Sequence, residues 1–278
     1  MWTQKLCRRT VRPWYGLLKP KRNRRILGSD ISGTVEAVGP LVTRFRPGDD
    51  VFGDHWDNWG GFAEFVCTKE TAMEHKPQNA TFEQAAAVPQ AGGLAMQGLR
   101  TAGQLPPGQK VLINGAGGGV GTFAIQLAKL ADAEVTGVDA GHKLDVMRMA
   151  GSDHVIDYAK TDFTESSNSY DLIIDCQCNR PMRNYKRVMA PDGALVMVGG
   201  KRILPVLMQG PLARFTGEPR TFHLAIDGPN IGLTEMKELI EADKLYPVID
   251  QTYPLCEVPD AMRYFEDGRH KGKIVISI

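Results

Sequence analysis

A glycine-rich turn between an apolar strand and an amphipathic helix is the feature that most constrains the fold of this chain. The apolar run 110–114 is followed directly by Gly115-Ala116-Gly117-Gly118-Gly119-Val120-Gly121 and then by a helical pattern. Ala116, Gly118 and Gly121 occupy the small-residue positions of the GxGxxG pattern. These positions permit a sharp turn, close approach of a pyrophosphate, and packing of helix on strand. Because free N–H groups at a helix start bind phosphates, residues 115–121 predict a dinucleotide-binding site.

Strand and helix patterns alternate from residue 110 to residue 226. Such alternation is typical of an α/β fold with a doubly wound parallel sheet, which binds its ligand at the carboxyl ends of the strands. The predicted strands are 110–114, 133–138, 154–157, 171–175, 194–199 and 221–226, and the predicted helices are about 119–131, 143–150 and 181–189.

The segments on either side of this region have other patterns. Short apolar runs at 31–38, 50–52 and 62–67 lie between glycine and proline turns, and they predict the strands of a small β-rich unit. After the sheet, the patterns predict helices at 233–243 and 259–266 and a final strand at 273–278.

Composition and charge exclude several classes of protein. A formal net charge of +1 gives no overall bias toward nucleic acid, and no apolar run approaches the roughly 18 residues of a membrane span. The five cysteines are odd in number and include no CxxC pair, which disfavours a disulfide framework and a cysteine-rich zinc site. We therefore expect a cytoplasmic protein with neither a membrane nor a nucleic acid as its partner.

The first 29 residues are unusual, since they contain nine Lys or Arg residues and no acid. Three interpretations stay open. A mitochondrial presequence is also Arg-rich and acid-poor, but it is serine-rich and amphipathic, whereas this stretch has no serine before Ser29 and contains two prolines. A nucleic-acid contact has only the charge in its favour. The third interpretation is a solvated loop or the edge of a cleft.

Several spaced motifs resemble those of one enzyme family. They are Gly28-Ser-Asp-Ile-Ser-Gly-Thr-Val-Glu-Ala-Val-Gly39, Phe45-Arg-Pro-Gly-Asp-Asp-Val-Phe-Gly53, Gly61-Phe-Ala-Glu-Phe-Val66 and Ala85-Ala-Ala-Val-Pro89, followed by the glycine turn. In this order they resemble the medium-chain dehydrogenase/reductase superfamily, and within it the zinc-independent quinone oxidoreductase-like branch.

The resemblance implies a Rossmann NAD(P)-binding domain inserted into a GroES-like catalytic domain. Residues 1–90 would form a partial catalytic domain, 91–226 the nucleotide domain, and 227–278 a return segment that completes the catalytic domain. Relatives usually carry about 55 further residues before the segment that matches Met1, so we expect a truncated catalytic domain here. The threonine that touches the nicotinamide end in the family is replaced by Leu94.

The resemblance also bears on metal binding. Zinc-dependent relatives place a histidine ligand where this chain has Ser29. A catalytic zinc needs about three protein ligands and one open position, and His55 and Cys67 have no obvious third partner. We expect no metal site.

Without a metal to polarise a carbonyl, acceptors that spread negative charge themselves are favoured. Quinones and α,β-unsaturated carbonyls do so, with hydride supplied by NAD(P)H. The alternative function is a redox-sensing or structural dinucleotide-binding protein with little or no turnover. A homodimer is expected from the resemblance alone.

Candidate residues for the substrate side lie on the loop 54–59. Asp54 or His55 would donate a proton, and Trp56 and Trp59 would hold a flat substrate between them. On the cofactor side, the ends of two strands place Asp175 and the pair Val198 and Gly199 at the crevice. Two alternatives stay open: the loop aromatics only pack on their own domain, and the strand-end residues only form ordinary turns.

Asp139 decides our expectation for the cofactor, which is NADH. This residue ends the second strand about 20 residues beyond the glycine turn, where a carboxylate normally holds the ribose hydroxyls. At about 4 Å and an effective dielectric constant near 20, a 2′-phosphate charge would be repelled by roughly 4 kcal/mol. Lys143 and Tyr158 match positions that contact the 2′-phosphate in related reductases, so use of both cofactors stays open.

Overall fold

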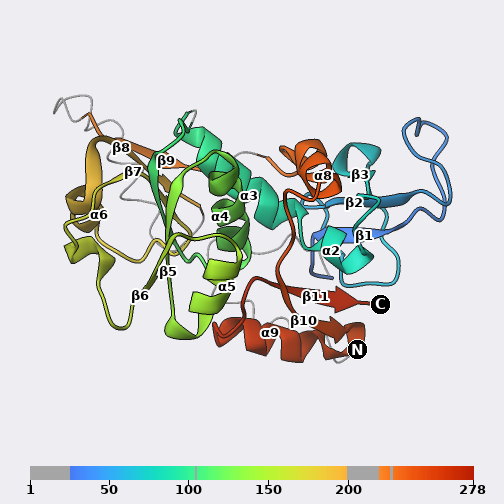
Figure 1. Cartoon of the computed structure of the whole chain (residues 1–278). Helices are drawn as coiled ribbons and strands as arrows, with labels where there is room; N and C mark the ends of the chain where they lie inside the picture. Colours follow the sequence, from blue (N-terminus) through green and yellow to red (C-terminus); the bar gives the residue numbers. More distant parts are fainter. Residues whose placement is uncertain (1–25, 104, 199–218, 226–227) are drawn as a thin grey trace.

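The computed structural model describes residues 26–103, 105–198, 219–225 and 228–278. These residues form two lobes, one built around a six-stranded sheet and the other around two smaller sheets (Figure 1). The basic segment 1–25 and Gly199, which was predicted to lie at the cofactor crevice, are outside the described residues. None of the described helices is both long enough and apolar enough to span a membrane.

The larger sheet is parallel throughout, with the strand order β6-β5-β4-β7-β8-β9. Its strands are β4 (Lys110–Asn114), β5 (Glu134–Asp139), β6 (His154–Asp157), β7 (Tyr170–Asp175), β8 (Met189–Met197) and β9 (Thr221–Leu224). Strand β4 pairs with β5 on one side and with β7 on the other. The order in which the chain adds strands to the sheet therefore reverses at β4. Ligands bind at such a reversal, outside the carboxyl ends of the strands. The prediction of a doubly wound parallel sheet is confirmed.

Helices cover this sheet on both sides. They are α3 (Pro89–Thr101), α4 (Gly119–Leu130), α5 (Leu144–Met149) and α6 (Met182–Val188), with short 3-10 helices at Gly141–Lys143 and Phe163–Glu165. The predicted strands and helices of this lobe all form, with ends shifted by a few residues, the largest shift being that β8 begins at Met189.

The second lobe combines early and late parts of the chain. Antiparallel strands β1 (Asp30–Thr34), β2 (Asp50–Asp54) and β3 (Glu74–His75) form one sheet, and parallel strands β10 (Ile249–Pro254) and β11 (Lys273–Ser277) form another. Its helices are α2 (Phe82–Ala86), α8 (Leu233–Glu241) and α9 (Val258–Glu266), with 3-10 turns at Glu70–Ala72 and Leu255–Glu257. The return of the last segment to the β-rich unit is visible in Figure 1.

One predicted strand of this lobe is wrong. Residues 62–67 form no strand. The N–H of Phe62 donates to the carbonyl oxygen of Leu27, but the residues after it are not part of any β-sheet. The side chain of Phe65 is 76% exposed, so the apolar pattern that suggested a strand does not reflect burial.

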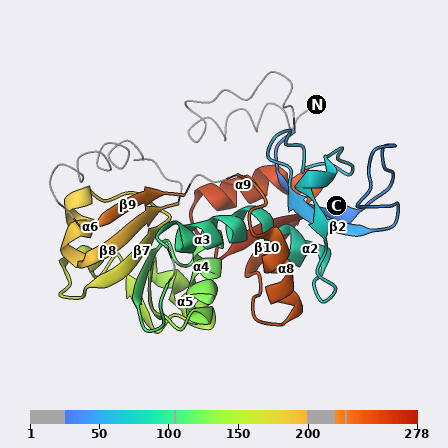
Figure 2. The ribbon, with the colours of Figure 1, turned by 90° about the horizontal axis from the view of Figure 1, so that it is seen from above.

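Helix α3 joins the lobes and was not predicted, because three glycines interrupt its sequence. The structure shows why two of them are there. A Cβ at Gly92 would lie 2.5 Å from the Met236 side chain, and one at Gly98 would lie 3.1 Å from Val198. The glycines therefore let α3 pack closely on α8 and on the sheet, between the two lobes (Figure 2).

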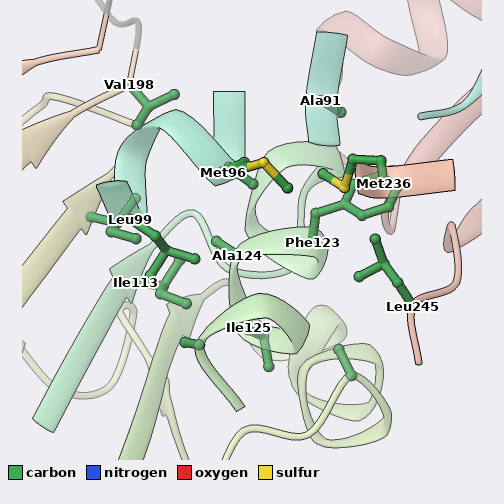
Figure 3. Packing of buried hydrophobic residues seen from close by; sticks show 14 of the residues in the cluster. Ala91, Met96, Leu99, Ile113, Phe123, Ala124, Ile125, Val198, Met236 and Leu245 are labelled. Carbon is green, nitrogen blue, oxygen red and sulfur yellow. The ribbon is translucent and has the colours of Figure 1, made fainter. Parts of the chain in front are cut away.

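The main core surrounds this helix. Figure 3 shows Met96 of α3 beside Phe123 of α4 and Met236 of α8, and all three are buried. The proposed boundary between residues 90 and 91 falls inside α3, and the division at 90 and 226 stays a prediction.

Candidate functional site

The glycine turn begins where β4 ends, and two of its residues need the freedom of glycine. Gly115 has φ 87°, a conformation that disfavours other residues. A Cβ at Gly121 would lie 2.3 Å from the Gly115 carbonyl oxygen and 2.5 Å from Ala116 Cα. Gly121 therefore permits the close contact of helix α4 with the turn. The contact at Gly121 fits the predicted role of the third small residue, whereas the positive φ falls on Gly115, one residue before Ala116.

Gly118 has a different environment. It is the residue before α4, with φ −91°, and a Cβ there would meet nothing closer than the Gly115 carbonyl oxygen at 3.4 Å. The space beside Gly118 is therefore open to a ligand, and N–H groups at the start of α4 lie next to it. The geometry is compatible with a bound pyrophosphate.

A buried ion pair closes the other side of the turn. Asp139 accepts hydrogen bonds from the N–H of Gly117 at 2.9 Å and from the N–H of Ala140 at 2.8 Å. Its carboxylate lies 3.8 Å from Lys143 Nζ, and both side chains are less than a tenth exposed. The structure thus brings Asp139 and Lys143 together, and each carboxylate oxygen of Asp139 already accepts one hydrogen bond from the protein backbone.

The return segment lies against the same turn, which the sequence did not indicate. The Gly272 N–H donates to the Gly117 carbonyl oxygen at 2.8 Å, and Gly118 and Gly272 form a parallel bridge. The Lys273 side chain passes beside Gly119, where an added Cβ would be 2.8 Å from it, and its Nζ contacts Asp30 at 3.1 Å. Both lobes therefore contribute to the edge of the dinucleotide site.

Other predicted cofactor residues have varied surroundings. Asp175 is fully buried, and its carboxylate accepts from Asn114, from the N–H groups of Gln177 and Cys178, and from the Tyr185 hydroxyl. These contacts indicate that it holds the turn after β7 rather than a ligand. Val198 lies just after β8, 4% exposed, and packs near Gly98. Tyr158 is half exposed beyond Asp139, whose carbonyl accepts its N–H.

A cavity of about 290 Å³ lies in the second lobe, next to Lys273. Its walls are mainly apolar and come from five separate parts of the chain, with Ser29, Asp30, Gln90 and Lys273 as its polar residues. The apolar residues include Leu27, Trp56, Trp59, Phe62, Val258, Met262, Phe265 and Ile274. An apolar cavity with a few converging polar groups is the usual form of a small-molecule site.

Of the four substrate-side candidates, two line this cavity. The rings of Trp56 and Trp59 lie 5.5 Å apart at 43°, which is the range of about 4.5–7 Å for aromatic rings in contact. No flat substrate fits between them, so the expected sandwich is not formed. They instead form one wall.

Asp54 and His55 point elsewhere. The His55 ring is bonded through Nδ1 to Thr68 Oγ1 at 2.7 Å, and burial lowers its pKa, so it is a structural residue. Asp54 is 4% exposed, and its Oδ1 has no hydrogen-bond partner among the described residues. Burial, together with the charge of Asp30, raises the pKa of Asp54 to about 6, against an opposing effect of the Ser29 hydroxyl beside it.

Potential metal ligands do not cluster in the described part of the chain. No three His, Cys, Asp or Glu side chains there lie close enough together to hold an ion. Ser29 lies in the cavity wall.

Comparison with known proteins identifies the family. Residues 4–96 match the alcohol dehydrogenase GroES-like domain and residues 150–276 match a domain described as zinc-binding dehydrogenase. NAD(P)H oxidoreductase RTN4IP1, mitochondrial, of Bos taurus is 34% identical over 91% of this chain and 70% of its own length. The 2-methylene-furan-3-one reductase of Solanum lycopersicum is 31% identical over 90% of this chain and 62% of its own.

Solved structures agree with this result. The quinone oxidoreductase from Coxiella burnetii superposes with a TM-score of 0.81 at 28% identity, over 91% of this chain and 79% of that one. The proteins similar to this chain include NAD(P)H and quinone oxidoreductases. Sequence, strand order and the glycine turn thus lead to one family, and the chain belongs to the medium-chain dehydrogenase/reductase superfamily.

Proposed function

We propose that this oxidoreductase uses NAD(P)H to reduce quinones or α,β-unsaturated carbonyl compounds, without a catalytic zinc ion. The observation that carries the proposal is the position of the apolar cavity beside the glycine turn, with Lys273 contacting both. A cofactor on the turn and an acceptor in the cavity would then be neighbours. The relatives named as a quinone oxidoreductase and a furanone reductase support this substrate class.

The cofactor site is proposed to consist of the turn and the neighbouring strand ends. Residues 115–121 would bind the pyrophosphate, Asp139 and Lys143 would lie at the adenosine ribose, and Val198 and Gly199 would lie at the nicotinamide. The bound nicotinamide would supply hydride chemistry. Asp139 is the reason to expect a preference for NADH near neutral pH, because its carboxylate repels a 2′-phosphate.

The chain's own residues would orient the acceptor and supply a proton. The apolar wall formed by Trp56 and Trp59 would exclude water from a flat, conjugated acceptor. Asp54, whose pKa is raised to about 6 by burial and by Asp30, holds a proton in weakly acidic solution. The Ser29 hydroxyl lines the cavity and lies beside Asp54, so it would pass that proton to the acceptor oxygen. Ser29, in place of a histidine ligand, also supports zinc independence.

Steady-state kinetics test the proposal. Oxidation of NADH and of NADPH would be followed with a benzoquinone, a conjugated enone, a saturated aldehyde and ethanol as the second substrate. The proposal expects kcat/KM to be highest for a quinone or enone and unchanged by chelators. Faster turnover of ethanol or of the saturated aldehyde would overturn the substrate class. Binding of NADH without turnover of any acceptor would favour a redox-sensing or structural protein.

The assembly and the compartment are also proposals. Strand β9 is at the edge of the six-stranded sheet, and pairing of two such edges would give a homodimer; a monomer in light scattering at micromolar concentration would contradict it. A cytoplasmic location is proposed from the cysteine pattern, with a mitochondrial location as the alternative that fluorescent tagging of the full chain would detect.

A further inference from the structure

We propose that His270, on the return segment, forms with Lys143 a subsite for the 2′-phosphate of NADPH, and that binding of this phosphate is accompanied by protonation of the His270 ring. The inference deepens the proposed function and rests on it. It makes the choice between NADH and NADPH depend on pH.

The backbone places His270 at the ribose end of the dinucleotide site. Gly272, two residues later, is bonded to Gly117 of the turn at 2.8 Å. A Cβ at Gly117 would in turn lie 2.7 Å from Lys143 Cβ and 3.2 Å from the Asp139 carboxylate. The Asp139–Lys143 pair and the return segment therefore both contact Gly117, and the charges of Asp139 and Lys143 act on His270.

The His270 ring is held in place but lacks a hydrogen bond. It stacks on Phe265 with centroids 4.7 Å apart and 22° between the planes. Its Nδ1 is buried and has no partner among the described residues. A buried nitrogen without a partner is unfavourable, and an anionic oxygen at this point would satisfy it.

Charges around His270 come from several elements. Burial first, and then the Lys143 charge, lower the pKa of His270 to about 4; Asp139 and Asp250 act in the opposite direction, and His142 adds to the lowering. The Tyr264 hydroxyl bonds Asp250, and Lys271 bonds Asp145 of α5. Hence the ring is neutral at pH 7 in the free protein.

A 2′-phosphate would reverse this balance. The acidic residue that ends the second strand marks the position of the ribose hydroxyls, so the phosphate would arrive beside Asp139 and Lys143. It carries between one and two negative charges near neutral pH, and Lys143 is already paired with Asp139. The added negative charge would favour the cationic ring, which takes one proton from solvent and breaks no covalent bond.

The sign of the pH effect follows from this proton. A ligand whose binding takes up a proton binds more tightly as the pH falls, by at most tenfold per pH unit for one proton. NADPH should therefore gain on NADH between about pH 8 and pH 6, whereas binding of NADH should change little.

Calorimetry with cofactor fragments tests the inference. Binding of 5′-ADP and of 2′,5′-ADP would be measured at about pH 6.5 in two buffers that differ in ionisation enthalpy, which gives the number of protons taken up. We expect 2′,5′-ADP to take up more protons than 5′-ADP, and His270→Gln to remove most of that excess. His142→Gln is the matched control, because His142 is an exposed histidine next to Lys143 in the chain, and it should keep the excess. Protonation of the phosphate itself is common to all three proteins.

The outcomes separate the two proposals. No binding of 5′-ADP would mean that the proposed cofactor site is wrong. Binding of 5′-ADP with equal proton uptake for 2′,5′-ADP in the parent and in His270→Gln would overturn the inference alone. If the variant does not fold, the parent decides by itself, since a ratio of the two Kd values that stays constant from pH 8 to pH 6 also overturns it.

Discussion

The proposed site has a cofactor half and an acceptor half, and each contains one buried aspartate. The surroundings of these two aspartates are opposite in character. At the cofactor half, Asp139 is compensated by two backbone N–H donors and by Lys143. At the acceptor half, Asp54 has one carboxylate oxygen without a partner in the described residues, and another acid, Asp30, acts on it. Hydrogen-bond donors and a neighbouring cation stabilise a buried carboxylate, whereas burial beside another acid raises the pKa of Asp54.

The halves also differ in how the chain builds them. The glycine turn and the Asp139–Lys143 pair come from one continuous segment, strand, turn, helix and strand, between residues 110 and 143. The acceptor cavity draws on five separate segments, from Leu27 to Ile276. We therefore expect substitutions in the first half to disturb the fold strongly, and substitutions in the second to change pH dependence or substrate affinity.

The largest effect is expected at the glycine turn, where two neighbouring glycines should behave differently. Gly121→Val places its Cβ against backbone atoms that cannot move aside, so we expect a loss of about 4 kcal/mol in the free energy of unfolding. Gly118→Val has space for its Cβ and should stay folded, but it should weaken NADH binding at least tenfold. Urea denaturation and calorimetry measure both. Undiminished affinity in folded Gly118→Val would remove the pyrophosphate from this position.

Lys143→Met should have the next largest effect on stability. It leaves the Asp139 carboxylate buried beside the turn without its cation, at a cost of about 3 kcal/mol. Adding Asp139→Asn to the same protein should recover most of that loss. Denaturant unfolding of the two single variants and the double variant forms a thermodynamic cycle. If the losses in unfolding free energy of the two single variants simply add in the double variant, the ion pair at 3.8 Å contributes nothing to stability. It would then not account for the difference between the surroundings of Asp139 and Asp54.

Asp54→Asn should stabilise the protein, but only above pH 4. Burial and Asp30 raise the pKa of Asp54 from 3.8 to about 6 in the folded state, so the folded protein holds a proton that the unfolded chain releases. Stability is therefore lost as the pH rises from about 4 to 6, and the gain from Asn is at most about 3 kcal/mol at pH 7.5.

Unfolding at pH 4 and at pH 7.5 measures this difference. Asp57→Asn is the control on the same loop, since the Asp57 side chain is 71% exposed, and it should change stability little at either pH. A gain from Asp54→Asn that is equal at both pH values would mean that proton binding is not its cause. If Asp54 supplies the proton through Ser29, kcat of the parent should decrease as the pH rises through about 6. Asp54→Asn should remove this decrease.

The smallest effect is expected at the aromatic wall. Trp56→Leu removes an aromatic contact worth about 1 kcal/mol and should raise KM for a ring-shaped quinone several-fold with little change in kcat. Trp56→Phe should restore most of the affinity. An unchanged KM for quinones of different size would place the acceptor outside this cavity.

Much of the cofactor half was predictable because local rules govern it. The bounds of β4 and the residues of the turn follow from an apolar run and from small residues at fixed spacing. Helix α3 was missed, because its glycines read as breaks until the partners Met236 and Val198 are known. Residues 62–67 were predicted as a strand from their apolar pattern and do not form one. A strand needs a hydrogen-bonded partner strand, and the pattern of one segment does not show whether such a partner exists.

The sequence by itself determined the strand, turn and helix of the nucleotide site, the doubly wound class of the sheet and the family, because each depends on residues within a short span or on motifs in order. Only the tertiary structure decided which distant residues meet. Lys273 was predicted only as the first residue of a final strand, and no role was predicted for Gly272 or His270. Their place beside Gly117 and Gly119 depends on the path by which the chain returns across the interface of the lobes, and on backbone hydrogen bonds that no local pattern encodes.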